Sequence, residues 1–158
     1  FAVQGYGIEP DLMTSAKSLG GGVPCGAVLC RADIAGHFGP GDLGTTFGGG
    51  PLAAAAIGAV IDTIRDENLL TNVREQEARI REHCVTGPVT RIQGKGLLLG
   101  LVCDRPALDV RNALLEHDIL TGTSADPNVV RILAQLVIND EHVDHLAHAL
   151  AAVTGAGA

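Results

Sequence analysis

Residues 13–27, MTSAKSLGGGVPCGA, place one of only two lysines in the chain, Lys17, shortly before three consecutive glycines, with two residues between them. Lys17 follows a short segment suited to a β-strand. Because glycines cost conformational entropy when they become ordered, three together indicate backbone that approaches another group closely. The residue alone allows two interpretations: a cation near the end of an element, or an amine that bonds covalently to a carbonyl. The second interpretation expects the strand and the glycine loop to bury the amine.

The segments around this stretch alternate between strand and helix patterns. Pro51 suits the first position of a helix, where its missing N–H costs nothing. A break at residues 86–88 separates the helical from the later strand-rich part. Strands are predicted over residues 8–14, 26–30, 89–93, 97–103, 119–121 and 129–133. Helices are predicted from residue 51 onward and over residues 69–84, 108–117 and 141–153. A single helical turn is predicted at 32–37 and a glycine-rich loop at 39–50. This alternation predicts an α/β fold with a domain boundary within the helix that ends near residue 84.

Composition narrows the class of protein. The 158 residues are 46% hydrophobic and 18% charged, which favours a folded chain over a disordered one. A net charge of −7 and 3% aromatic residues disfavour a nucleic-acid partner. The longest strongly apolar run, residues 51–61, is too short to span a bilayer, and no signal peptide is visible. Four scattered cysteines indicate free thiols in a reducing compartment, and hence a cytoplasmic location.

Other polar residues have ordinary interpretations when each is taken alone. Arg131 stands among apolar residues of a short strand, where an arginine commonly extends to solvent or pairs with an acid. Thr46 suits an ordinary turn threonine. Lys95, between two glycines, is interpreted as a turn lysine. His142, His145 and His148 recur every three residues, which spreads them around a helix, so we expect a solvated face and no metal site.

Four segments, in order, resemble the class III aminotransferases that depend on pyridoxal 5′-phosphate (PLP). YGIEPDLMTSAKSLGGGVPCGAVL (6–29) is similar to their lysine segment, and GTTFGGGPLAAAA (44–56) to their second motif. RIQGKGLLLGL (91–101) is similar to the strand pair that opens their small domain, and NVVRILAQLVI (128–138) to their substrate-arginine segment. HFGPGDLGTTFGG (37–49) is most similar to the acetylornithine and succinylornithine subgroup.

The resemblance implies a fold and a set of site residues. Residues 1–80 would be the end of the PLP-binding large domain of a fold type I transferase, and residues 81–158 its α/β small domain. Lys17 would hold PLP covalently and then move protons as general base and acid. Thr46 would hydrogen-bond the cofactor phosphate across a dimer interface, and Arg131 would bind a substrate carboxylate.

The resemblance also implies an activity: amino transfer from N-acetylornithine to 2-oxoglutarate in arginine metabolism, by a homodimer. Two alternatives stay open: a 4-aminobutyrate or ornithine type of ω-transaminase, and a non-catalytic binding or dimerisation module. The chain corresponds only to the C-terminal part of the family pattern. The phosphate loop, the ring-stacking aromatic and the aspartate that pairs the ring nitrogen would lie in a preceding part, in a longer chain or a separate N-terminal half. We therefore expect little activity from these residues alone.

Overall fold

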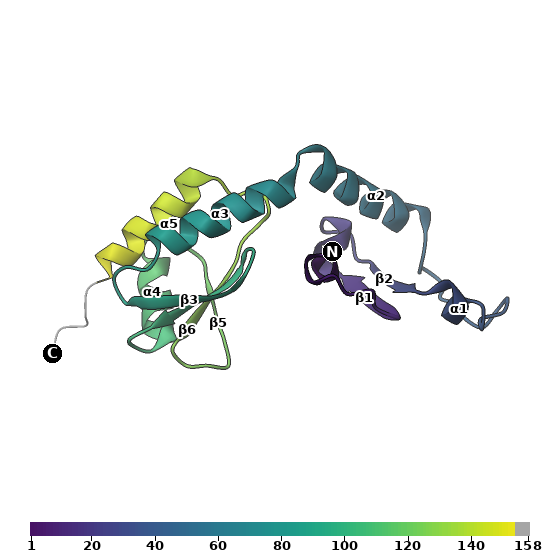
Figure 1. The fold of residues 1–158 in the computed structure, drawn as a ribbon, viewed down its shortest axis with the longest axis horizontal. Helices are drawn as coiled ribbons and strands as arrows, with labels where there is room; N and C mark the ends of the chain where they lie inside the picture. The colour runs from purple at the N-terminus through teal and green to yellow at the C-terminus, as the bar shows by residue number, and fades with distance from the viewer. Residues whose placement is uncertain (154–158) are drawn as a thin grey trace. The chain divides into compact units, whose positions relative to one another are not determined.

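The computed structural model describes residues 1–153 and divides into two compact units (Figure 1). The first unit is Phe1–Glu67, and the second begins at Asn68. The sequence placed the boundary at residue 80, whereas the structure divides the chain earlier. The reason is the helix α3 (Leu69–His83), which buries Gln76 and Ile80 in the second unit. The expected large-domain and small-domain identities of the two parts stay predictions.

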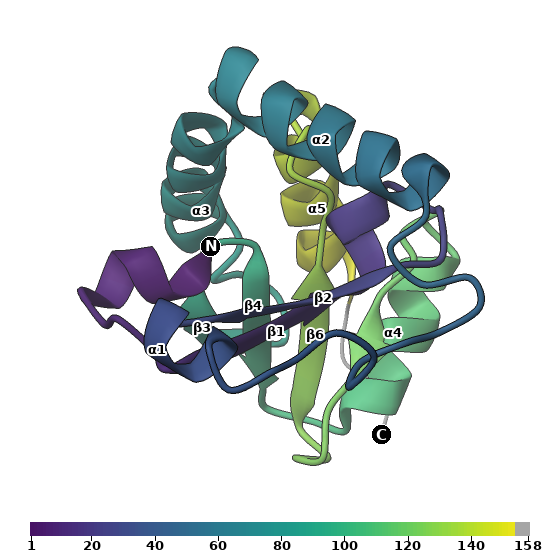
Figure 2. The same cartoon turned by 90° about the vertical axis from the view of Figure 1, so that its right-hand side faces the viewer.

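The first unit is built on a β-hairpin. Its elements are η1 (Ala2–Tyr6), β1 (Leu12–Ala16), η2 (Lys17–Gly20), β2 (Gly26–Cys30), α1 (Ala32–Ala35) and α2 (Pro51–Asp66). Strands β1 and β2 pair antiparallel, with Met13 opposite Leu29 (Figure 2). The predicted strand 8–14 begins only at Leu12, because the chain first turns through Gly7, which has a φ of 63°. Helix α2 begins at Pro51, as predicted.

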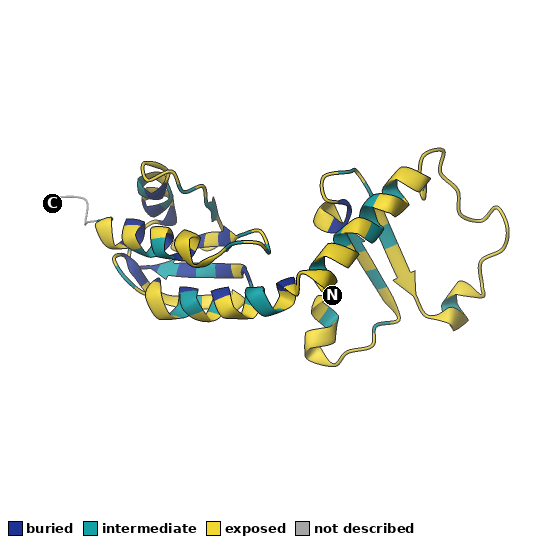
Figure 3. Ribbon diagram, turned by 90° about the horizontal axis from the view of Figure 1, so that it is seen from above, coloured by how far each residue is buried: buried dark blue, intermediate teal, exposed yellow. Residues whose placement is uncertain are grey.

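This first unit has little interior within the described chain. Its buried residues are Leu19 and Gly20, and α2 buries none (Figure 3). Large apolar side chains such as Val28 and Phe47 are exposed, Phe47 to 92%. Since apolar burial is the dominant driving force of folding, the hairpin and α2 gain little stabilisation from each other.

The second unit holds one four-stranded antiparallel sheet in the order β3-β4-β6-β5 within residues 68–153. Its further elements are β3 (Val89–Lys95), β4 (Leu98–Cys103), α4 (Ala107–Leu115), β5 (Gly122–Thr123), β6 (Val129–Leu133) and α5 (Asp140–Ala152). The predicted strand 119–121 is wrong. Ile119 instead donates its N–H to the Leu114 carbonyl (3.0 Å) to close α4, with Asp118 left-handed at φ 61°, and β5 starts only after this cap.

Alternation along the strands produces the core of the second unit. Leu101 of β4 and Val130 of β6 point to the face covered by helices, where they meet Ile80 of α3, Leu114 of α4 and Leu150 of α5 in one buried cluster. The strand residues between them point to the opposite face. Because successive side chains of a strand point to opposite faces of the sheet, burial of one set in the core also decides which residues lie on the open face.

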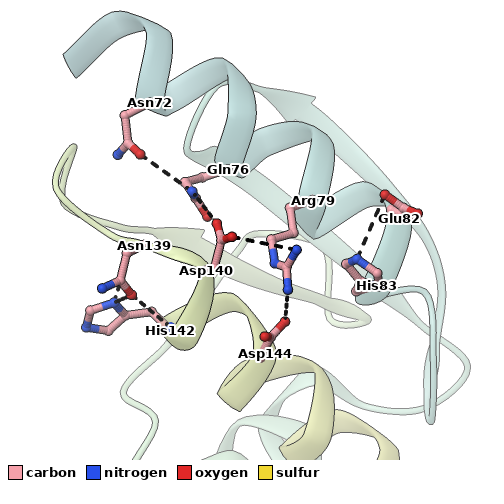
Figure 4. A network of polar contacts seen from close by, with 9 residues as sticks. All are labelled: Asn72, Gln76, Arg79, Glu82, His83, Asn139, Asp140, His142 and Asp144. Carbon is pink, nitrogen blue, oxygen red and sulfur yellow. Dashed lines mark hydrogen bonds and ion pairs between the residues drawn. The ribbon is translucent and has the colours of Figure 1, made fainter. Parts of the chain in front are cut away.

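Polar contacts join α3 to α5 (Figure 4). The buried Gln76 donates through Nε2 to Asp140 Oδ1 (2.9 Å). Arg79 donates to Asp144 Oδ1 (2.6 Å), and this hydrogen bond raises the arginine pKa above its ordinary value. The bonds to Asp140 and Asp144 therefore tie α3 to α5. Asn72 of α3 donates to the Leu136 carbonyl (2.7 Å) in the loop between β6 and α5.

Two histidines of α5, His142 and His145, make hydrogen bonds within the second unit. Nδ1 of His142 accepts from the Asn139 N–H (3.2 Å) while Asn139 Oδ1 accepts from the His142 N–H, which caps the helix start. His145 donates through Nε2 to the His117 carbonyl (2.8 Å). Among residues 1–153, no cluster of His, Cys, Asp and Glu side chains is arranged to hold a metal ion. No helix within that same range is long and apolar enough to cross a bilayer.

Candidate functional site

Lys17 lies where β1 ends. Ala16 is the last residue of the strand, and Lys17 opens η2 with a φ of 58°, in the left-handed region. Side chains other than glycine rarely adopt this conformation, and it is enriched at functional sites, where surrounding structure holds it. Helix α2 packs on the same turn: a Cβ added to Gly21 would meet Val60 Cγ2 at 3.1 Å. The glycine there allows the close approach that the sequence indicated.

An open hollow of about 560 Å³ lies beside this lysine, and we call it the Lys17 hollow. It is lined by Lys17, Ser18, Gly22, Val23, Pro24 and Cys25. The Lys17 side chain is exposed, so the expectation that the strand and glycine loop bury the amine is wrong for the described residues. A primary amine beside glycine backbone in an open hollow suits covalent attachment of an aldehyde-bearing group, because nothing in the lining blocks its approach.

Thr46 lies elsewhere in the first unit. It is exposed on the loop between α1 and α2 and is not part of the lining of the Lys17 hollow. The structure therefore does not bring Thr46 and Lys17 into one described site. Its expected role, contact with a phosphate across a dimer interface, stays a prediction.

Arg131 lies in the middle of β6, on the sheet face opposite the core. It pairs with Gly100 of β4 and Gly122 of β5. A Cβ on Gly122 would meet the Arg131 guanidinium nitrogens at 3.1 and 3.2 Å, so the guanidinium lies over this glycine. No hydrogen bond or ion pair from Arg131 to another residue within 1–153 is found. An exposed fork of five donors is therefore available to a carboxylate.

A second hollow, of about 310 Å³, opens beside this arginine, and we call it the Arg131 hollow. Its lining comprises Gln93, Gly94, Leu98, Leu99, Gly100, Ser124, Val129 and Arg131. Gln93 was missed by the sequence analysis, although strand alternation puts it on the same face as Arg131. Lys95, expected to be a turn lysine, is the last residue of β3, where it pairs with Leu98 directly beside the turn. The Lys17 and Arg131 hollows belong to different units, and each is described by itself.

The buried cysteines lie apart from both hollows. All four cysteines are free thiols, as predicted. Cys84 and Cys103 belong to the core of the second unit. Burial raises the pKa of the Cys84 thiol to about 11, and burial likewise raises the pKa of Cys103. Both thiols are neutral packing groups at ordinary pH, because the reactive form is the thiolate.

Known proteins similar to this chain are aminotransferases. Acetylornithine aminotransferase 1 of Bordetella bronchiseptica is 42% identical over 155 residues, which cover 95% of this chain and 39% of that protein. Acetylornithine aminotransferase of Corynebacterium efficiens is 41% identical over 154 residues, covering 97% and 38%. The chain therefore spans about two fifths of the length of the curated relatives it matches.

Solved structures agree with these relatives. Acetylornithine aminotransferase from Elizabethkingia anophelis superposes with a TM-score of 0.85 at 28% identity, covering 96% of this chain and 42% of that one. Ornithine aminotransferase from Toxoplasma gondii superposes with a TM-score of 0.85 at 30% identity, which covers 96% of this chain and 38% of that one. Another structure of the Toxoplasma enzyme has PLP at partial occupancy in its active site. The family model of class-III aminotransferases matches residues 1–154, and the chain belongs to that family.

Proposed function

We propose that this chain is the C-terminal part of a PLP-dependent aminotransferase that moves an amino group from N-acetylornithine to 2-oxoglutarate in arginine biosynthesis. The observation that carries the proposal is Lys17, held left-handed at the mouth of an open hollow in a chain of the class-III family. The acetylornithine assignment rests on relatives of that name at 41–42% identity. The division into a large-domain part and a small-domain part belongs to the same proposal.

The roles of the residues follow from their chemistry. Lys17 is the covalent attachment point of PLP, which supplies a carbonyl for amines and an electron sink when bound. Once the substrate amine has displaced Lys17 from the cofactor, the freed Lys17 Nζ would take the proton from the substrate carbon that bears the amino group and would later return a proton, as general base and acid. Arg131 holds a substrate carboxylate with its fork, and Thr46 donates to the cofactor phosphate from a second copy of the chain.

We also propose that the working protein is a cytoplasmic homodimer that needs a preceding polypeptide part, either in a longer chain or as a separate N-terminal half. The exposed apolar side chains of the first unit support this, because such surface is normally covered in a stable fold. The 158 residues alone are therefore expected to show little or no amino transfer.

A second candidate is an ornithine type of ω-transaminase. The specific observation in its favour is the ornithine aminotransferase of Toxoplasma gondii, whose TM-score equals that of the acetylornithine enzyme from Elizabethkingia. Substrate profiling of the whole protein separates the two: faster turnover of N-acetylornithine than of ornithine supports the first candidate, and the reverse supports the second.

The first test is a PLP titration of the 158-residue chain followed by absorbance, then borohydride reduction and peptide mapping. Reduction makes the cofactor link permanent, so we expect a pyridoxyl group on Lys17 and its loss in Lys17→Ala. The chain provides its own matched control, since Lys95 is the only other lysine. Equal labelling of Lys95 would contradict the proposed role of Lys17. No labelling at all would mean either that the chain is a non-catalytic binding module or that the preceding part is needed to bind PLP, which the same labelling of the longer protein distinguishes.

A further inference from the structure

One row of paired residues crosses the sheet of the second unit on the face opposite the core. Gln93 of β3 pairs with Gly100 of β4, Gly100 pairs with Arg131 of β6, and Arg131 pairs with Gly122 of β5. Paired residues point to the same side of a sheet. Because Gly100 has no side chain, none from β4 stands in this row between Gln93 and Arg131. The space over Gly100 is taken by the Gln93 side chain and by Val129, whose Cγ1 would lie 2.8 Å from a Cβ added there. Gln93, Gly100, Val129 and Arg131 all line the Arg131 hollow.

The Gln93 amide has a defined orientation in this row. Arg91, two residues earlier on the same face, donates through Nη1 to Gln93 Oε1 (3.1 Å). A guanidinium only donates, so this bond assigns the amide oxygen to the Arg91 side. A Cβ added to Gly100 would meet Gln93 Nε2 at 3.3 Å and Cγ at 3.1 Å. The amide NH₂ group therefore lies over Gly100, next to Arg131 in the row, while the Arg131 guanidinium lies over Gly122 on the other side of β6.

The polar character of the Arg131 hollow is that of an anion site. Arg131 offers donors without an acceptor among the described residues, and the Gln93 oxygen is already engaged. No acidic side chain of residues 1–153 is in the lining. The strands around it carry three cations on this face, Arg91, Lys95 and Arg131. Donors in excess, with positive charge nearby, favour a carboxylate over a neutral ligand.

We propose that Gln93 is a second substrate-binding residue, whose amide N–H donates to the carboxylate that Arg131 grips, and that Arg91 is a positioning residue that turns the amide toward it. A carboxylate accepts about four hydrogen bonds, so an arginine fork leaves lone pairs for a further donor. The ligand class is a carboxylate-bearing amino acid or oxo acid. This inference rests on the proposed role of Arg131 and extends it.

The test is a titration of the ¹⁵N-labelled 158-residue chain with glutarate, followed by the NMR signals of the Arg131 Nε–H and the Gln93 side-chain NH₂. Both signals should shift with one dissociation constant. Gln93→Ala should weaken binding about tenfold, as loss of a hydrogen bond to a charged group does. Gln93→Glu should abolish binding, because the new carboxylate occupies Arg131. The control Gln135→Ala removes an exposed glutamine outside the Arg131 hollow and should leave binding unchanged.

The positioning role of Arg91 has its own test. Arg91→Ala should weaken glutarate binding and move the free-state signal of the Gln93 NH₂ group, because the amide loses the donor that orients it. Arg91→Lys keeps a donor at this place and should restore much of the affinity. If Arg91 had only a structural role, Arg91→Ala would leave the Gln93 signal in place and Arg91→Lys would not restore the affinity. An unmoved Gln93 signal in Arg91→Ala would overturn the positioning role.

Other outcomes separate this inference from the proposed function. If Arg131→Ala abolishes binding while Gln93→Ala leaves it unchanged, the role of Gln93 is wrong and that of Arg131 stands. If inorganic phosphate shifts the same signals with equal affinity, the face binds anions in general and the carboxylate assignment is overturned. If glutarate shifts nothing, both assignments on this face are wrong. The pyridoxyl labelling of Lys17 reports on amino transfer independently of all these results.

Discussion

Replacement of Gly87 by alanine should unfold the second unit at much milder conditions than any ordinary surface change. Gly87 lies in the turn between α3 and β3 and has a φ of 55°. A Cβ there would lie 2.0 Å from the Leu150 carbonyl oxygen and 2.8 Å from its carbon. The obstacle is the backbone of α5, so no flexible side chain can move aside. The turn and the end of the helix would have to separate.

The expected loss has two parts. A left-handed backbone costs a residue with a Cβ about 1–2 kcal/mol, and forcing extra atoms into a packed contact costs about 1–3 kcal/mol, so the total is about 2–5 kcal/mol. Typical domains are stable by about 5–15 kcal/mol, so this is a large fraction of the free energy of unfolding. For a unit of this size, each kcal/mol lowers the melting temperature by about 4–8 °C, so it should fall by at least about 8 °C.

The measurement is a urea titration followed by the methyl NMR signals of Leu101 and Val130, which report on the core of the second unit alone. Gly96→Ala is the matched control. Gly96 has a φ of 59°, but its added Cβ would meet only Val73 Cγ1, at an ordinary 3.4 Å. The control should lose only the backbone part. Equal losses of stability in the two variants would refute the reasoning, because the clash with α5 would then contribute nothing.

Two further predictions concern buried groups of the second unit. Burial raises the pKa of Cys84 to about 11, so in the folded chain iodoacetamide at about pH 8 should alkylate the exposed Cys30 fast and Cys84 slowly. In urea both cysteines should react fast. Mass mapping measures the two rates, and equal rates in the folded chain would contradict the prediction. Asp140→Ala should cost about 1–3 kcal/mol by urea titration, because the buried Gln76 amide loses its acceptor. In a Gln76→Leu background, Asp140→Ala should lower the free energy of unfolding by less. An equal loss in both backgrounds would show that the Gln76–Asp140 hydrogen bond does not contribute to stability.

Local patterns predicted much of the fold. Strand β6 occupies the predicted residues 129–133, since a short apolar run with one arginine suits only a strand with one covered face. Helix α2 begins at Pro51 because proline fits the first turn. The strand expected at 119–121 failed because Asp118 adopts a left-handed cap, and aspartate carries a weaker signal for that conformation than glycine does.

The candidate site was predictable only in part. Lys17 and Arg131 carry distinctive chemistry in recognisable segments, so both could be singled out from the residues, whereas the hollow beside each is known only from the structure. Their roles stay predictions. The exposure of Lys17 did not follow, because burial depends on packing of distant segments. The pairing of Gln93 with Arg131 across Gly100 depends on the register of three strands far apart in sequence, which no local pattern contains. The boundary at Glu67 likewise depends on which core receives α3.

At position 17, the residue that would best stabilise the fold differs from the residue that the proposed chemistry requires. Glycine would occupy a φ of 58° without steric cost, yet the chain has lysine there, between a strand and a glycine run. If folding stability were the only requirement, glycine would be favoured at position 17, since natural chains keep strained residues mainly where function requires them. Lysine at this torsion therefore costs the fold stability that glycine would not, which is the relation expected if the proposed chemistry requires an amine at position 17.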